Sequence, residues 1–230
     1  MMDARLLMIA GIAPGAGKSS LARHLAECFS SRGVDVLEVD EDSVWGRRQT
    51  GRGPIDRSSV WPEFVDLLPG PERESWPTSE EFVRAFCRVR QRRLAGVGAW
   101  IQDWSWLDLA GTAPWATTDE SSLVEFSRRL RLEADSLKPA VLYLVGEPEV
   151  FLKRAVAERG HLWLSRHARE LARWEGLSAL RGVAEAYAEL DGERRRVLEV
   201  GGWCPAYVVA DDADVQTVLD RALTALGVEL

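Results

Sequence analysis

The sequence has few cysteines and no long hydrophobic run. Its three cysteines, Cys28, Cys87 and Cys204, lie far apart and form no CxxC pair. This spacing argues against a zinc site and is typical of reduced thiols in a cytosolic protein. No stretch approaches the ~20 apolar residues that a membrane-spanning helix needs. The apolar run 6–12 is short, has a weak basic flank and passes directly into a glycine-rich loop, so we expect no signal peptide. We therefore expect a cytoplasmic protein with no membrane partner.

Positive charge is also scarce. Lys and Arg number 29 against 36 Asp and Glu, which gives a formal net charge of −7 and a pI near 5.2. Nucleic-acid surfaces depend on dense Lys and Arg fields, so we expect no nucleic-acid partner. The three histidines, His24, His161 and His167, show neither metal spacing nor a triad context. We expect a small-molecule partner whose charge is met locally, and a second copy of the chain stays open as a further partner.

Short apolar runs alternate with helical patterns along the 230 residues. We expect strands at 5–10, 34–39, 98–102, 140–145 and 206–210. We expect helices at 18–31, 79–94, 148–160, 168–190 and 214–226. This alternation predicts a single α/β domain, 1–230, with a parallel sheet of about five strands covered by helices on both faces. The proline-rich region 46–78 does not follow the pattern and is predicted to be a loop-rich insertion near an acceptor site.

The strongest motif is GIAPGAGKS at residues 11–19, between the first expected strand and the first expected helix. Such a loop holds phosphates with its backbone N–H groups, while the lysine reaches the β and γ oxygens and the serine hydroxyl binds Mg²⁺. Strict counting places the first consensus glycine at Ile12, whereas the glycine stands one residue earlier. The predicted nucleotide-binding residues are Gly11, Pro14, Gly15, Ala16, Gly17, Lys18, Ser19 and Ser20. An ordinary strand-to-helix turn is the alternative.

Acidic residues follow the second and third expected strands. Asp40 and Asp42 come after the second strand, beside the phosphate loop, where a carboxylate can accept the proton of an acceptor hydroxyl. Capping of a local helix is the alternative for both. Asp103 follows the third strand, where P-loop enzymes hold Mg²⁺ or its bound water, so Ser19 and Asp103 are the predicted metal-side residues. An exposed turn aspartate is the alternative for Asp103.

A later segment resembles a known family. Residues 139–144 (PAVLYL), followed by Pro148-Glu149, Leu152, Arg154 and Arg159-Gly160, resemble the strand, helix and arginine-bearing lid of the thymidylate kinase and deoxynucleoside kinase group. The resemblance covers most of the chain as a succession of elements. It implies a P-loop NTPase fold, ATP and Mg²⁺ as cofactors, and a lid at 159–170.

The resemblance also implies roles for individual residues. Asp40 matches the acceptor-side carboxylate of deoxynucleoside kinases, and Trp45 matches a tryptophan found five residues later in some of them. Asp103 matches the acid that opens their Asp/Glu-Arg motif. Arg154, Arg159 and Arg166 are the lid arginines that would hold the transferring phosphoryl group. A solvated helix face is the alternative for these arginines.

The sequence departs from this family next to the predicted metal-side acid. Trp104 stands where the resemblance predicts an arginine, so an apolar ring replaces a partner for an oxyanion. Seven of the ten tryptophans lie between the second and fourth expected strands. Trp45, Trp104 and Trp106 are predicted to form an aromatic wall for a planar or bulky acceptor, with the hydrophobic core as the alternative.

The chemistry predicted from these features is phosphoryl transfer. Arg84 and Arg88 recur at helical spacing and could reach the acceptor, although an exposed basic face explains them equally well. We expect an ATP-dependent kinase that phosphorylates a hydroxyl of a nucleoside or another small molecule. A nucleoside monophosphate kinase and a P-loop ATPase or switch protein are the alternatives.

Overall fold

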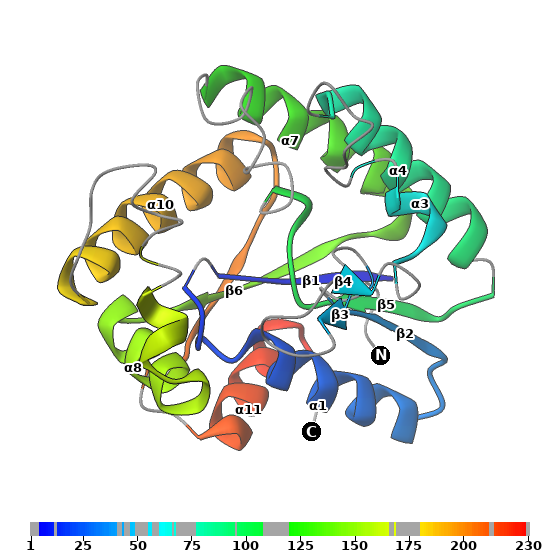
Figure 1. Cartoon of the computed structure of the whole chain (residues 1–230). Coiled ribbons are helices and arrows are strands. Elements are labelled where there is room, and N and C mark those ends of the chain that lie inside the picture. The colour runs from blue at the N-terminus through cyan, green and yellow to red at the C-terminus, as the bar shows by residue number, and fades with distance from the viewer. Residues whose placement is uncertain are drawn as a thin grey trace.

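A computed structural model of the chain shows a parallel sheet between two layers of helices (Figure 1). It describes residues 5–11, 13–40, 43, 47–48, 55–56, 60–65, 67, 77–94, 96–107, 120–165, 168, 180–211 and 214–228.

Five parallel strands form the sheet in the order β2-β5-β1-β6-β7. Their bounds are Leu6–Ala10 (β1), Val36–Val39 (β2), Ala99–Gln102 (β5), Ala140–Val145 (β6) and Ala206–Val209 (β7). The central strand β1 pairs with β5 through Leu7↔Ile101 and with β6 through Leu7↔Ala140. The first strands lie on one side of β1 and the last strands on the other. Open α/β sheets bind ligands where the winding reverses, beyond the carboxyl ends of the strands.

Helices cover both faces of the sheet (Figure 1). Their bounds are Lys18–Ser31 (α1), Pro62–Val65 (α3), Ser79–Arg93 (α4), Glu120–Ala134 (α7), Pro148–Arg159 (α8), Leu180–Val200 (α10) and Val215–Ala225 (α11), with a 3-10 turn at Asp135–Leu137. Strand side chains alternate between the faces, so Met8 packs toward α4 and α7 while Ile9 packs toward α1, α8 and α11. The helix α10 serves both layers, with Tyr187 in one core and Val197 in the other.

The predicted fold class is confirmed, and all five expected strands are present to within two residues at either end. Local chemistry explains why two helices begin where predicted. Thr78 and Glu81 form a capping box at the start of α4, in which Thr78 N–H donates to Glu81 Oε2 at 2.6 Å. Pro148 occupies the first turn of α8, where its missing N–H costs nothing.

Two helices differ from the sequence-based expectations. The helix α7 was not predicted, although Leu123, Phe126 and Leu130 recur at helical spacing and are buried. Of the helix expected at 168–190, the structure describes Ala168 and the part from Leu180 onward, where α10 continues beyond the predicted end to Val200. Its buried residues Val197 and Leu198 extend the core-facing side beyond the predicted end.

The predicted insertion at 46–78 contains some regular structure. The short strands β3 (Arg47–Arg48) and β4 (Ile55–Asp56) pair antiparallel in a separate two-stranded sheet. The helix α3 follows and inserts Phe64 into the core that α4 and α7 cover. This segment is therefore attached to the domain through apolar packing at α3.

Candidate functional site

The predicted phosphate loop, residues 11–19, connects β1 to α1, and its last two glycines are required by backbone geometry. Gly15 and Gly17 have φ values of 83° and 91°, in the left-handed region that other residues rarely adopt. A Cβ at Gly15 would lie 2.1 Å from the carbonyl oxygen of Phe151, whereas a Cβ at Gly17 would meet no atom within 4 Å. Gly15 therefore lets the loop pack directly on the backbone of α8, and Gly17 lets it turn into α1.

The first glycine of the loop also has a structural role, although it stands one residue before the consensus position. Gly11 has φ 144°, and a Cβ there would lie 3.0 Å from the carbonyl oxygen of Leu144 in β6. Its own carbonyl accepts a hydrogen bond of 2.8 Å from Lys18 Nζ. Ile12 lies outside the described residues. Glycine at position 11 therefore fits the observed loop, in which the Lys18 ammonium folds back onto the carbonyl group at the start of the loop.

The amino end of α1 is open to an anion. Its N-cap residue is Gly17, which supplies no side-chain hydrogen bond, and its first turn contains no acidic residue. The first N–H groups of a helix lack partners within the helix, and the helix dipole adds a positive potential there. With Lys18 at the same point, this end of the 14-residue helix suits a phosphate group.

A cavity of ≈ 700 Å³ lies beside this loop. That volume falls within the usual range of small-molecule sites. Every predicted nucleotide-binding residue except Gly11 lines this cavity, and so do Asp103 and two of the predicted lid arginines. These lining residues are Pro14, Gly15, Ala16, Gly17, Lys18, Ser19, Ser20, Asp103, Arg154 and Arg159. Gly11 contributes through its carbonyl contact with Lys18 instead.

Asp103 lies directly after β5 and is only 6% exposed, so it is not an exposed turn aspartate. Burial raises the pKa of its carboxyl, while a hydrogen bond from Ser19 and the charge of Lys18 lower that pKa. Its Oδ1 has no hydrogen-bond partner within the described part of the chain. A buried carboxylate oxygen without a partner, next to a serine hydroxyl, suits a divalent cation or the water that such a cation holds.

Asp40 follows β2 and is exposed. Its Oδ1 accepts hydrogen bonds from the backbone N–H of Ser43 at 3.0 Å and from the Ser43 hydroxyl at 2.8 Å. This is the local capping contact that was the alternative interpretation, and it occupies one carboxylate oxygen. The charge of Asp40 also raises the pKa of Asp103, so the two acids face the same region. Asp42, the second acid predicted there, lies outside the described residues.

The lid arginines have different environments. Arg154 donates from Nη1 to the carbonyl oxygen of Ala210 at 2.8 Å, which ties α8 to the end of β7. Arg159, at the last position of α8, stacks its guanidinium on Trp163, with its central carbon 5.4 Å from the ring centroid. Arg166 lies outside the described residues. Of the predicted lid, 159–170, the structure describes 159–165 and Ala168.

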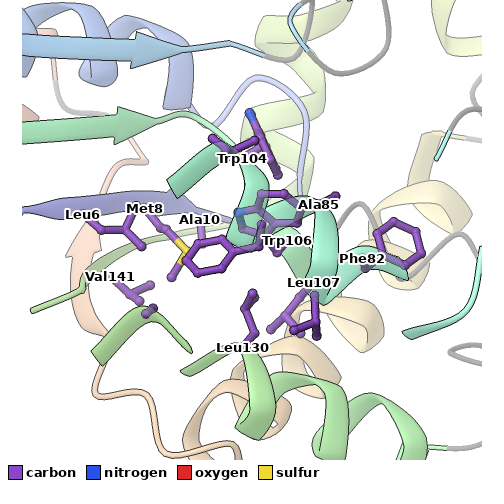
Figure 2. Close-up of a cluster of buried hydrophobic side chains, with 14 of the residues drawn as sticks. Leu6, Met8, Ala10, Phe82, Ala85, Trp104, Trp106, Leu107, Leu130 and Val141 are labelled. Carbon is purple, nitrogen blue, oxygen red and sulfur yellow. The ribbon is translucent and has the colours of Figure 1, made fainter. Parts of the chain in front are cut away.

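The predicted aromatic wall needs a correction. Trp104 and Trp106 are 4% and 0% exposed and belong to the hydrophobic core, with ring centroids 5.2 Å apart (Figure 2). Phe64 of α3 packs against both rings. Neither tryptophan lines the cavity beside the phosphate loop. Trp45 lies outside the described residues. Burial by α3, which sequence spacing does not reveal, places these rings in the core.

The two arginines predicted to reach the acceptor belong to α4. Arg88 donates from Nη2 to the backbone oxygen of Glu63 at 3.3 Å, which links α4 to α3. Arg84 is exposed, and its charge acts on Glu80, one turn earlier in the same helix. Arg88 therefore has a structural contact, and Arg84 matches the exposed basic face that was its alternative.

Part of the cavity wall was not predicted from the sequence. It is formed by residues from the end of α8, the turn after it, α10, and the region from β7 to α11, namely Glu158, Trp163, Tyr187, Ala210, Val215 and Val218. Trp163 follows Arg159-Gly160 within the predicted lid, so its position beside a lid arginine was the one available signal. Tyr187 is brought in by α10.

The residues at the loop end of the cavity fit a nucleotide with a divalent cation. The open helix terminus and Lys18 supply the positive potential that phosphates require, and Ser19 and Asp103 supply oxygen ligands. Among the described residues, no group of three or more His, Cys, Asp or Glu side chains gathers as a metal-binding cluster. A cation here would therefore take most of its ligands from phosphate and water, as Mg²⁺ commonly does.

Comparisons with known proteins give structural neighbours only. No protein-family model and no curated protein sequence matches the chain. Among solved structures, a tRNA delta(2)-isopentenylpyrophosphate transferase from Staphylococcus epidermidis is 14% identical, with 96% of this chain and 98% of that chain covered and a TM-score of 0.45. The crystal structure of APE1195 is 15% identical, with 87% and 94% covered and a TM-score of 0.38. Likeness at this level carries no information about the reaction.

None of the described helices is both long enough and apolar enough to span a membrane.

Proposed function

We propose that this chain is an ATP-dependent kinase that transfers the γ-phosphoryl group to a hydroxyl of an uncharged small molecule, either a nucleoside or another compact natural product. The observation that carries the proposal is the cavity in which Lys18, Ser19 and the buried Asp103 meet at the open terminus of α1. An ordinary strand-to-helix turn would not need a carboxylate buried against its first helical serine.

The chain's own groups divide the work of binding. Lys18 would exchange the Gly11 carbonyl for the β and γ oxygens of ATP, and the N–H groups of α1 would hold the phosphate chain. Ser19 and Asp103 would hold the metal side of the nucleotide, and the bound Mg²⁺ would supply neutralisation of the phosphate charge. Such binding places the phosphoryl group at the carboxyl end of β1 and leaves the region beyond β2 for the acceptor.

Asp40 is the group best placed to act on the acceptor. Its Oδ1 is engaged by Ser43, and this contact fixes the orientation of the carboxylate while the side chain stays exposed. Asp40 does not line the cavity itself, but its charge acts on Asp103, which does. A carboxylate held in this way can accept the proton of an acceptor hydroxyl and orient that hydroxyl toward the phosphorus.

The experiment is an assay of Mg·ATP consumption with a panel of nucleosides and hydroxylated natural products, run on the wild-type chain and on Lys18→Ala. We expect turnover that depends on one class of acceptor and falls by several orders of magnitude in the variant, because the point charge on the phosphates is lost. Thermal unfolding of both proteins checks that the fold is retained. Turnover that is indifferent to every acceptor would favour the ATPase or switch, and normal turnover by Lys18→Ala would refute nucleotide binding by this loop.

A further inference from the structure

Three cations line the described part of the cavity, and two of them are already engaged by protein oxygens. Lys18 donates to the Gly11 carbonyl, and Arg154 donates to the Ala210 carbonyl. Arg159 makes no hydrogen bond or ion pair with any described residue, and its contact is the face of the Trp163 ring. Arg159 and Trp163 both line the cavity, so the guanidinium lies within reach of a ligand bound there.

The backbone at the end of α8 brings these two side chains together. Gly160 ends the helix with φ 82°, and its N–H donates to the Val156 carbonyl at 2.8 Å. The chain then turns, and the Trp163 N–H donates to the Gly160 carbonyl at 3.1 Å within a new helical segment at 161–165. This turn places the indole under the guanidinium that immediately precedes Gly160.

We propose that Trp163 is a positioning residue that holds Arg159 at the terminal phosphate of the bound nucleotide. The proposal rests on the proposed function and gives the two described lid arginines different roles. Arg154 anchors α8 to the end of β7, and Arg159 supplies the cation for the phosphoryl group. A guanidinium stacked on an indole keeps all of its N–H donors available at its edge, so the stacking orients the cation without consuming the groups that bind phosphate.

The contact geometry supports an energetic effect of measurable size. The guanidinium carbon lies 5.4 Å from the indole centroid, inside the ~6 Å range of cation–π attraction. Arg159 is exposed, so without the ring its long side chain would sample many rotamers and reach the phosphate less often. The indole thus restricts the cation to the mouth of the phosphate site.

The test measures the dissociation constants of Mg·ADP and Mg·ATP by calorimetry and takes their ratio, which isolates contacts to the terminal phosphate. Trp163→Leu should lower the ratio roughly two- to fivefold, as expected for an exposed cation–π contact. Trp163→Phe should retain most of it because an aromatic face remains. Leu162→Ala is the matched control, since Leu162 lies next to Trp163 and is 67% exposed.

A double-variant cycle separates positioning from direct contact of the indole with the nucleotide. In the Arg159→Gln background, Trp163→Leu should have no further effect on the ratio, because the cation that the ring holds is already gone. An equal loss in both backgrounds would overturn the proposal, as would an unchanged ratio in Trp163→Leu alone. Failure of the wild-type chain to bind Mg·ATP would instead refute the proposed function, and the inference with it.

Discussion

Burial of the charged Asp103 carboxylate is unfavourable for the fold, although this residue is proposed to hold the metal side of the nucleotide. Its carboxyl is buried, and the resulting increase in its pKa means that the charged form is disfavoured in the folded state. Asp103→Asn should therefore leave the free energy of unfolding at pH 7 unchanged or higher, while raising the Mg²⁺ concentration needed for turnover. A denaturant titration and a Mg²⁺ titration of activity measure the two effects.

The pH dependence follows from the same pKa. A carboxyl whose folded-state pKa lies above its unfolded value stabilises the fold at low pH, and this contribution is lost as pH rises through the folded-state pKa. The stability advantage of Asp103→Asn should therefore grow with pH.

Asp40→Asn should instead reduce transfer by roughly 10²–10⁴-fold at unchanged Mg·ATP affinity if Asp40 is the general base. An equal Mg²⁺ dependence in both variants would contradict this division of roles.

Because Trp104 is buried, its substitution is expected to change the stability of the protein rather than acceptor binding. Its ring is 4% exposed and contacts Phe64 and Trp106, so Trp104→Ala should destabilise the protein by about 3–5 kcal/mol. Its Nε1 has no hydrogen-bond partner among the described residues, so Trp104→Phe should cost much less. Urea unfolding of both variants measures the difference. A small loss of unfolding free energy in Trp104→Ala would contradict this packing. It would indicate that the ring is accessible, as a wall of the acceptor site has to be.

At the scale of elements, the phosphate loop and α8 act as one unit. The loop packs on the α8 backbone through Gly15, and α8 carries Arg154 and Arg159 to the cavity. The loop motif and the helix were both predicted from the sequence because each depends on local signals such as glycines, Pro148 and helical spacing. Their contact was not predicted, since it joins segments that lie more than a hundred residues apart.

Gly15→Ala and Gly17→Ala form a matched pair that tests this contact. Both residues have left-handed φ, so each alanine should cost about 1–2 kcal/mol of backbone strain. Only the Gly15 variant adds a clash, because its Cβ would lie 2.1 Å from the Phe151 carbonyl oxygen. We expect a clearly larger loss of unfolding free energy for Gly15→Ala in urea titrations. Equal losses would show that α8 yields without cost and does not support the loop.

At the scale of the whole molecule, local patterns predicted the sheet and the loop end of the site, but long-range packing decided the rest. The strands could be predicted because each is a short apolar run between turn signals. The wall formed by Trp163, Tyr187 and Val218 could not, because its members come from three segments that meet only in the folded chain. Trp104 was assigned to the acceptor because of its neighbour Asp103, although side chains of successive residues need not face the same space.

The overall charge distribution leads to the last prediction, that an uncharged acceptor is preferred over its phosphorylated counterpart. The chain carries a formal net charge of −7, and Glu38, Asp40 and Asp103 interact electrostatically at the carboxyl ends of β2 and β5. Two described arginines of α4 that could offset this charge are engaged, since Arg88 and Arg93 contact Glu63. An incoming phosphate would therefore meet like charge.

We expect kcat/KM for a nucleoside to exceed that for the matching nucleoside monophosphate by at least about tenfold, which corresponds to about 1.4 kcal/mol of transition-state stabilisation. Steady-state kinetics with matched pairs measures the ratio, and an increase of the monophosphate's kcat/KM with added salt would identify repulsion as the cause, because salt screens exposed charges. A consistent preference for the monophosphates would refute the prediction. It would also imply that a cation completes the acceptor site, and the exposed Arg84 of α4 is the described candidate, because Arg88 and Arg93 would have to break their contacts with Glu63 first.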